Sequence, residues 1–139
     1  MIDLAQYDLP AYDSINDLRR QIGDWVKEHF RIPVLNTVTN WPVQFNKDSR
    51  HHPVTSLAPG RVADLEEARL LTTLSLRQAL AEARYDHPQP KKPTDAPDVL
   101  GIHIFLANVR LAGVAYLLRL LVKEKTTGYY FYDHIVARA

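Results

Sequence analysis

The last forty residues contain three β-type segments separated by two short turns, and this pattern constrains the fold more than any other feature. The segments span 102–110, 114–123 and 129–136, with turns at Ala112-Gly113 and at Thr126-Thr127-Gly128. Short turns between strands join neighbours that run in opposite directions. The C-terminal part of the chain is therefore predicted to form an antiparallel meander.

Ahead of this meander, the apolar residues follow helical spacing. Between Ser14 and Phe30 they recur every three or four positions, which predicts a helix with one buried stripe that ends before Pro33. Two further helical patterns, from about 62 to 71 and from about 75 to 83, could form one bent helix. The predicted class is α+β, with N-terminal helices packed on a C-terminal antiparallel sheet of three to four strands.

The remaining segments are expected to connect these elements within a single domain over residues 1–139, in which 1–30 carries the N-terminal helix. Residues 34–45 are rich in β-branched residues and predict short strands around Thr39-Asn40, with Pro42 at a sheet edge. The polar segment 46–52 reads as a loop. The proline-rich segment 85–98 is expected to be a mobile surface loop.

Several functional classes have no basis in this sequence. It lacks cysteine, a glycine-rich phosphate loop, a serine elbow and a metal-ligand cluster of diagnostic spacing. Nucleotide hydrolysis and thiol or serine nucleophiles are therefore not expected, and neither a cofactor nor a bound metal is predicted. Without a secretory signal pattern or an apolar run long enough to cross a bilayer, the chain is expected to be cytoplasmic and to make no membrane contact.

The net charge of +1 is unevenly distributed, because acidic residues exceed basic ones in 1–30 and the reverse holds in 100–139. A basic sheet could meet a phosphate backbone, in which case RNA is the expected partner. The acidic first helix could cover that surface or face solvent. A cognate inhibitor or a host protein is a further candidate partner, and the oligomeric state stays open.

The first candidate cluster for chemistry is the segment 47–52, followed by Thr55. Its adjacent histidines, His51 and His52, lie beside Lys47 and Arg50. Histidines with a pKa near neutrality could act as general base or acid while the cations contact phosphate, a combination that suits cleavage of RNA through its own 2′-hydroxyl. The alternative is a polar loop with two solvent-facing histidines.

The second candidate cluster lies on the meander. Alternate residues of a strand share a face, so Arg119 and Lys123 are expected to project together, as are Tyr132 and His134. A four-residue connection at 125–128 would pair Arg119 with His134 and make a basic, titratable face. A five-residue connection would pair Arg119 with Asp133 as a plain ion pair.

Two other groups of side chains have both a functional and a structural interpretation. His103 could face a site or be a hydrogen-bonded sheet histidine. Trp25, Trp41 and the aromatic run 129–132 could stack on bases or serve core packing.

Taken together, these motifs resemble the large polyvalent protein associated domains of phages and conjugative elements. The resemblance rests on Ile102-His103-Ile104-Phe105, Val109-Arg110-Leu111, Tyr116, Leu118-Arg119-Leu120, Val122-Lys123-Glu124, Gly128 and Tyr132-Asp133-His134, and upstream on Trp25 to His29, Asn36-Thr37 and Phe45 to His52. This family is similar to the barnase-EndoU-colicin-RelE group of nuclease-like folds, in which helices precede a four-stranded antiparallel sheet.

The resemblance implies a small, metal-independent, RNA-cleaving effector or toxin domain. The residues it places in the catalytic cleft are His52, Arg119, Lys123 and His134, followed by Tyr132 and Thr55; the residues expected to contact substrate are Lys47, Arg50, His51 and Arg110. The alternative function is a non-catalytic module that binds RNA or protein, such as an inhibitor of host defence or an accessory part of a larger polyprotein.

Overall fold

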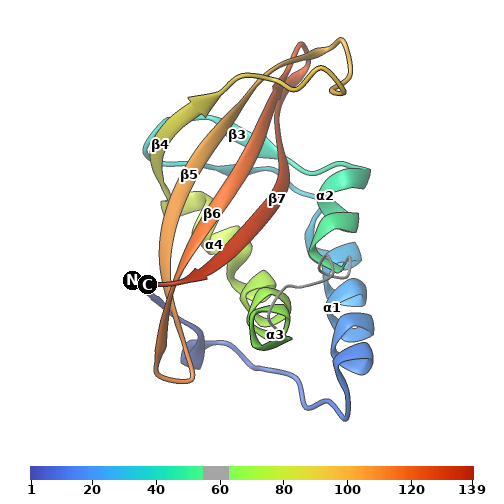
Figure 1. Cartoon of the computed structure of the whole chain (residues 1–139), viewed down its shortest axis with the longest axis vertical. Helices are drawn as coiled ribbons and strands as arrows, with labels where there is room; N and C mark the ends of the chain where they lie inside the picture. The colour runs from blue at the N-terminus through green and yellow to red at the C-terminus, as the bar shows by residue number, and fades with distance from the viewer. Residues whose placement is uncertain (55–62) are drawn as a thin grey trace.

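A curled β-sheet is the main element of the computed structural model, which describes residues 1–54 and 63–139 (Figure 1). Across these residues the sheet has seven strands in the order β1-β5-β6-β7-β3-β2, with β4 also paired to β5. The strands are β1 (Ile2–Asp3), β2 (Val34–Leu35), β3 (Pro42–Gln44), β4 (Arg84–Gln89), β5 (Val99–Leu111), β6 (Val114–Lys125) and β7 (Gly128–Arg138). With the helices described below, the predicted α+β class is confirmed.

The three long strands β5, β6 and β7 form the predicted antiparallel meander. β5 and β6 are joined by Ala112 and Gly113, whose φ angles of 50° and 77° match the right-handed twist of hairpin strands. β6 and β7 are joined by Thr126 and Thr127. Gly128 then opens β7 with a φ of 136°, a conformation that side-chain-bearing residues rarely adopt.

The sheet is larger than the predicted three to four strands, and two of its pairings are parallel. β1 adds in parallel to β5, with Ile2 opposite Val109, and β3 adds in parallel to β7, with Val43 opposite Tyr129. The added strands are only two or three residues long, too short to show an alternating pattern. The prediction of an entirely antiparallel sheet is therefore wrong on both sides of the meander.

β4 corrects the prediction of a surface loop over 85–98. Residues 84–89 pair antiparallel with β5, and Pro88 lies opposite His103. A proline lacks the N–H of a ladder bond, which is tolerated at an edge, and the described residues place no strand on the other side of β4. Pro42 was expected at an edge, yet β3 lies between β2 and β7.

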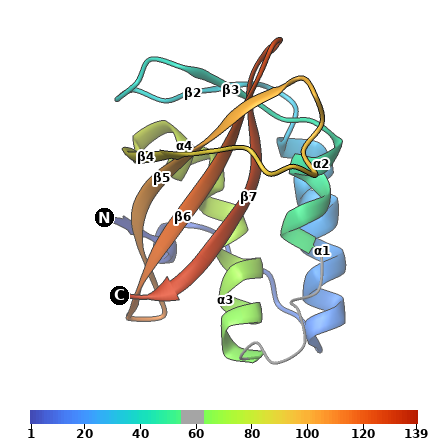
Figure 2. The same ribbon diagram turned by 45° about the horizontal axis from the view of Figure 1, so that its top comes forward.

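The helices cover one face of this sheet (Figures 1 and 2). They are α1 (Ile15–His29), α2 (Lys47–His51), α3 (Ala63–Thr72) and α4 (Leu76–Glu82), with 3₁₀ turns η1 (Leu4–Gln6), η2 (His52–Val54) and η3 (Thr73–Ser75). η3 joins α3 and α4 into one bent helical segment, which is one of the two arrangements that the periodicity left open. None of the helices in the described ranges has the length and apolar character needed to cross a membrane.

The N-terminal helix α1 is a core element rather than a removable cover. The Ser14 side chain caps its first turn by accepting the N–H of Asp17. Leu18, Ile22 and Val26 are at most 1% exposed and belong to the main apolar cluster. Removing residues 1–30 would delete this side of the core.

One row of the sheet brings the two ends of the chain near each other. Ile2 lies opposite Val109, Val109 lies opposite Tyr116, and Tyr116 lies opposite Arg138. Figure 1 accordingly shows the N- and C-terminal marks side by side.

Candidate functional site

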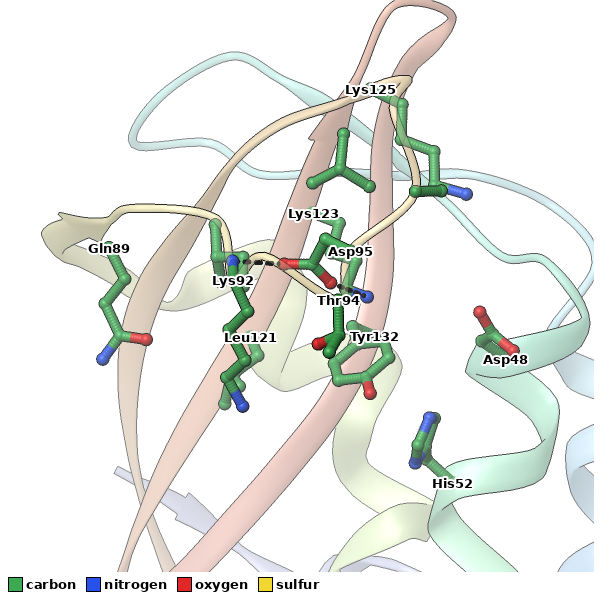
Figure 3. Close-up of a pocket in the computed structure, with 13 residues that line it drawn as sticks. Asp48, His52, Gln89, Lys92, Thr94, Asp95, Leu121, Lys123, Lys125 and Tyr132 are labelled. Carbon is green, nitrogen blue, oxygen red and sulfur yellow. Dashed lines mark hydrogen bonds and ion pairs between the residues drawn. The ribbon is translucent and has the colours of Figure 1, made fainter.

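A pocket of about 380 Å³ lies at the side of β7, between α2 and the connection 90–98 (Figure 3). The connection runs from β4 across β6 and β7 toward α2 before it turns back to β5 (Figure 2). The end of α2, this connection and one face of strands β5 to β7 supply the walls. The charged and titratable lining includes His52, Lys92, Asp95, Lys123, Lys125 and Tyr132.

Four of these side chains form a continuous row. The ring centroids of His52 and Tyr132 are 4.3 Å apart, with the ring planes inclined by 56°. Nζ of Lys123 lies 3.8 Å from the centroid of the Tyr132 ring and 3.1 Å from Oδ1 of Asp95. An aromatic face and a carboxylate both attract a cation. The Tyr132 ring thus contacts both the imidazole of His52, which can transfer protons, and the positively charged ammonium group of Lys123.

His52 is positioned by α2, where the sequence pattern predicted a loop. The Asn46 side chain accepts the N–H of Ser49 at 3.0 Å, and the Ser49 hydroxyl accepts the N–H of Asn46 at 2.9 Å, so the helix begins with a capping box. The Ser49 hydroxyl also donates to the backbone carbonyl of Phe131 in β7. This bond ties α2 to the strand and holds His52, just past the helix, against Tyr132.

A β-bulge in β7 decides which side chains face the pocket. Leu121 pairs with Asp133, whereas the next residue, Val122, pairs with Phe131. Tyr132 is therefore an extra residue without a partner on β6. Such a bulge bends the strand and breaks the alternation of faces, and here it presents Tyr132 to the pocket.

The bulge overturns two predictions about β7. Tyr132 and His134 were expected to share a face, but the interrupted alternation sends His134 into the core, where its exposed fraction is 0%. Arg119 lies opposite Ile135 rather than opposite His134 or Asp133. The four-residue connection is present, because Glu124 pairs with Tyr129, but the inserted Tyr132 moves the partner of Arg119 from His134 to Ile135. The five-residue connection is wrong.

Arg69 connects α3 to the backbone around His52. Its Nη2 donates to the carbonyl oxygen of His52 and to Oδ1 of Asp133, each at 2.7 Å, and its Nη1 donates to the carbonyl oxygen of Pro53 at 3.3 Å. Nδ1 of His52 lies 3.9 Å from Oδ2 of the same Asp133. With only 9% of the Arg69 side chain exposed, this charged group fixes the position of His52 from behind the pocket.

Burial lowers the pKa of His52 below its ordinary value of 6.5. The carboxylates of Asp133 and Asp48 oppose this effect, whereas the nearby charges of His51 and Arg69 reinforce it. The imidazole is therefore neutral at neutral pH. In that form it carries a nitrogen lone pair that can accept a proton.

Two predicted catalytic residues, His134 and Arg119, are not among the described residues of the pocket lining. Nε2 of His134 lies 3.1 Å from the carbonyl oxygen of Arg69, and burial together with the charge of Arg69 lowers the pKa of His134 to about 4. Arg119 is exposed on β6, apart from the lining residues. Thr55 lies outside the described residues. His52, Lys123 and Tyr132 are the predicted catalytic residues that the pocket brings together.

The predicted substrate-binding residues are also not among the described residues of the pocket lining. Lys47 and His51 are exposed on α2, and Arg50 donates from Nη1 to a backbone carbonyl just after α1 at 3.3 Å. Arg110 is exposed near the far end of β5, next to β1. The His51 ring meets the ring of His52 edge-on, with the centroids 6.0 Å apart, so His51 adjoins the row of four side chains.

His103 is the hydrogen-bonded sheet histidine that one interpretation of the sequence favoured. Its Nδ1 lies 2.9 Å from the hydroxyl of Tyr85, and its Nε2 lies 2.8 Å from Oε1 of Glu124. Trp41 stacks on Tyr129 at 4.2 Å with the rings 6° from parallel, and its ring also meets His103 edge-on. This aromatic group packs β3 against the meander.

Sequence reasoning missed the partners of the pocket residues, namely Arg69, Asp133, Asp95 and Lys92. A signal existed for Arg69, because it stands within the apolar stretch 68–71 of a predicted helix, and a buried arginine requires a partner. Asp133 was considered only as a partner of Arg119. Asp95 and Lys92 lie in a segment without periodicity, so no pattern could place them.

The fold and pocket define an α+β domain with a histidine- and lysine-lined site beside its central sheet. A family model described as large polyvalent protein-associated domain 3 matches residues 13–132, so the chain belongs to this family. The matched range contains His52, Asp95, Lys123 and Tyr132. No curated protein and no solved structure matches the chain.

Proposed function

We propose that this chain is a metal-independent endoribonuclease domain, an effector or toxin of phage or mobile-element origin that acts in the cytoplasm. The observation that carries the proposal is the contact row His52–Tyr132–Lys123 in one pocket. Cleavage of RNA through the 2′-hydroxyl requires a base near a fixed positive charge, and it requires no metal.

In the proposed reaction, neutral His52 takes the proton of the ribose 2′-hydroxyl. The 2′ oxygen attacks the adjacent phosphorus, and the bond from phosphorus to the 5′ oxygen breaks. Lys123, with Lys92 and Lys125 nearby, stabilises the negative charge gained by the phosphate in the transition state. The hydroxyl of Tyr132 gives a proton to the departing 5′ oxygen, which leaves a 2′,3′-cyclic phosphate and a 5′-hydroxyl as products.

The central strands support the proposed kinship with the barnase-EndoU-colicin-RelE group. β4, β5, β6 and β7 are consecutive along the chain and pair antiparallel with their neighbours. The helices precede them and pack on one face. Helices before a four-stranded antiparallel sheet is the arrangement expected of that group, and the short strands β1, β2 and β3 would be additions to it.

The test is incubation of purified chain with a labelled single-stranded RNA in the presence of chelator, beside the same sequence as DNA. We expect the RNA to be cut to cyclic phosphate ends and the DNA to remain intact. His52→Gln should lower the rate by roughly a hundredfold or more, and Lys123→Met should do likewise. His87→Gln and Lys91→Met change exposed residues outside the pocket and serve as matched controls.

Two results would contradict the ribonuclease proposal. The first is an absence of cleavage across a panel of structured and unstructured RNAs by a well-folded chain. The second is cleavage that His52→Gln leaves unchanged while thermal melting shows that the variant folds normally.

The second candidate function is a non-catalytic module that holds RNA or a protein in the same pocket. One observation favours it: the cation best placed for catalysis, Lys123, is already paired with Asp95 at 3.1 Å. A binding module predicts measurable RNA affinity without cleavage, or capture of one cognate inhibitor or host protein that Lys123→Met releases.

A further inference from the structure

One of the residues that the connection between β4 and β5 contributes to the pocket, Asp95, is more shielded than the others. Within 90–98 every residue except Asp95 is exposed. The Asp95 side chain is 9% exposed and the Lys123 side chain 14%, so their ion pair is largely shielded from water. The connection therefore places the carboxylate of Asp95 against the ammonium group of Lys123, as Figure 3 shows.

Both carboxylate oxygens of Asp95 have donors. Oδ1 accepts from Nζ of Lys123 at 3.1 Å, and Oδ2 accepts from the backbone N–H of Lys92 at 2.7 Å. The second bond lies within the connection itself, whereas the first would be available to a phosphate oxygen if the connection moved away, because a lysine ammonium group binds either anion.

The connection has few attachments to the rest of the fold. It is ordered by its own turns, in which Asp95 N–H donates to the Lys92 carbonyl at 2.9 Å and Val99 N–H donates to the Ala96 carbonyl at 3.0 Å. One backbone bond, from Thr126 to the carbonyl of residue 98 at 3.1 Å, ties its end to the turn after β6. Its exposed surface and these few bonds allow it to move at modest energetic cost.

We propose that Lys123 is the centre of a phosphate subsite and that Asp95 occupies this subsite in the unliganded chain as a built-in competitor. A phosphodiester and the Asp95 carboxylate cannot share Lys123, so RNA must displace the connection 90–98 to bind. The proposal rests on the proposed function for the identity of the ligand. It adds that, in the unliganded chain, Asp95 blocks the binding of other anions to Lys123.

The test measures binding apart from cleavage. In a His52→Gln background, the affinity for a fluorescent single-stranded oligoribonucleotide is measured by anisotropy at one fixed salt concentration. Asp95→Asn should tighten binding by about tenfold or more, since a like charge facing the ligand is removed. Asp86→Asn removes an exposed carboxylate that pairs with His87 and gives the matched control for the same change in net charge.

A further variant locates the effect at Lys123. Adding Lys123→Met to Asp95→Asn should abolish the gain in affinity. An equal gain in Asp95→Asn and Asp86→Asn would overturn the proposal, because the effect would then be one of net charge. Weaker binding by Asp95→Asn would also overturn it, since Asp95 would then serve to hold Lys123 in place, and so would an absence of RNA binding in every variant.

The outcomes also separate this proposal from the ribonuclease proposal. A gain in RNA affinity in Asp95→Asn, without cleavage by any chain with His52 intact, supports the phosphate subsite and contradicts the ribonuclease proposal. Cleavage that depends on His52, without a gain in RNA affinity in Asp95→Asn, supports the ribonuclease proposal and contradicts the role of Asp95 as a competitor.

Discussion

Acidification should destabilise the folded chain well before its carboxylates titrate, because His134 is buried in its neutral form. Nε2 of His134 lies 3.1 Å from the carbonyl oxygen of Arg69 and 3.3 Å from the hydroxyl of Thr72. Since a carbonyl only accepts, the neutral ring that satisfies both groups carries its proton on Nε2. Its Nδ1 is buried, and no hydrogen-bond partner for it lies within the described residues. Protonation would place a positively charged ring, with an N–H at this position, beside the guanidinium of Arg69. The carboxylate of Asp133 offsets the resulting repulsion only in part.

The size of the effect follows from the difference in proton affinity between the folded and unfolded chains. The pKa of His134 is about 4 in the folded chain against 6.5 ordinarily, so below pH 6.5 the unfolded chain binds more protons. Stability then falls by up to about 1.4 kcal/mol per pH unit. The loss should reach roughly 2 kcal/mol at pH 5 and about 3 kcal/mol at pH 4.

Urea unfolding at pH 7.5, 6 and 5 measures this loss while staying above the range in which carboxylates protonate. His134→Gln removes the titrating group and should flatten the pH dependence between 6.5 and 5. His52→Gln, measured separately, should remove a smaller part, because the pKa of His52 is lowered as well. Parallel loss of stability in the parent chain and in His134→Gln would refute the reasoning.

Three other substitutions test the surroundings of the pocket. Asp133→Asn should lower the pKa of His52 further, seen by NMR titration, because that carboxylate raises it; an unchanged or higher pKa would contradict this. Ser49→Ala should cost about 1–3 kcal/mol in urea unfolding, since it removes a cap and the bond to Phe131; no loss would show that α2 docks by other contacts. Gly128→Ala should cost about 1–3 kcal/mol in unfolding experiments because of its φ of 136°, and an unchanged midpoint would count against strain there.

Local patterns predicted the long elements of the fold. The spacing from Ser14 to Phe30 predicted α1, and the turn at Ala112-Gly113 predicted the hairpin of β5 and β6. These elements depend on periodicity and turn chemistry, which neighbouring residues determine. Even the bend between α3 and α4 was visible as two helical patterns.

Non-local pairings escaped prediction. β1 and β3 gain their strand conformation from β5 and β7, and a two- or three-residue strand has no pattern of its own. α2 was missed because its cap has Asn46 and Ser49 in place of the more usual serine followed by glutamate. In these segments the local sequence favours the observed conformation too weakly to reveal it, and tertiary contacts determine the structure.

For the site, residue chemistry was more predictable than geometry. His52 could be selected by residue type, Lys123 and Tyr132 by type and by strand position, and the three meet in the pocket. The assignment of His134 failed because alternation along β7 assumes an uninterrupted ladder. Asp95 reaches Lys123 through a connection without regular structure, which alternation and periodicity do not describe.

The row from Ile2 through Val109 and Tyr116 to Arg138 has a consequence for engineering the chain. Three strand spacings separate its ends, roughly 14 Å, so a linker of about five or six residues could join the C-terminus to the N-terminus. New termini could then be opened in the exposed part of the connection 90–98. Such a circular permutant would keep every strand pairing and would cut the connection that carries Asp95. Because its two ends lie close together, the domain could also be inserted into a loop of another protein without separating the ends of that loop.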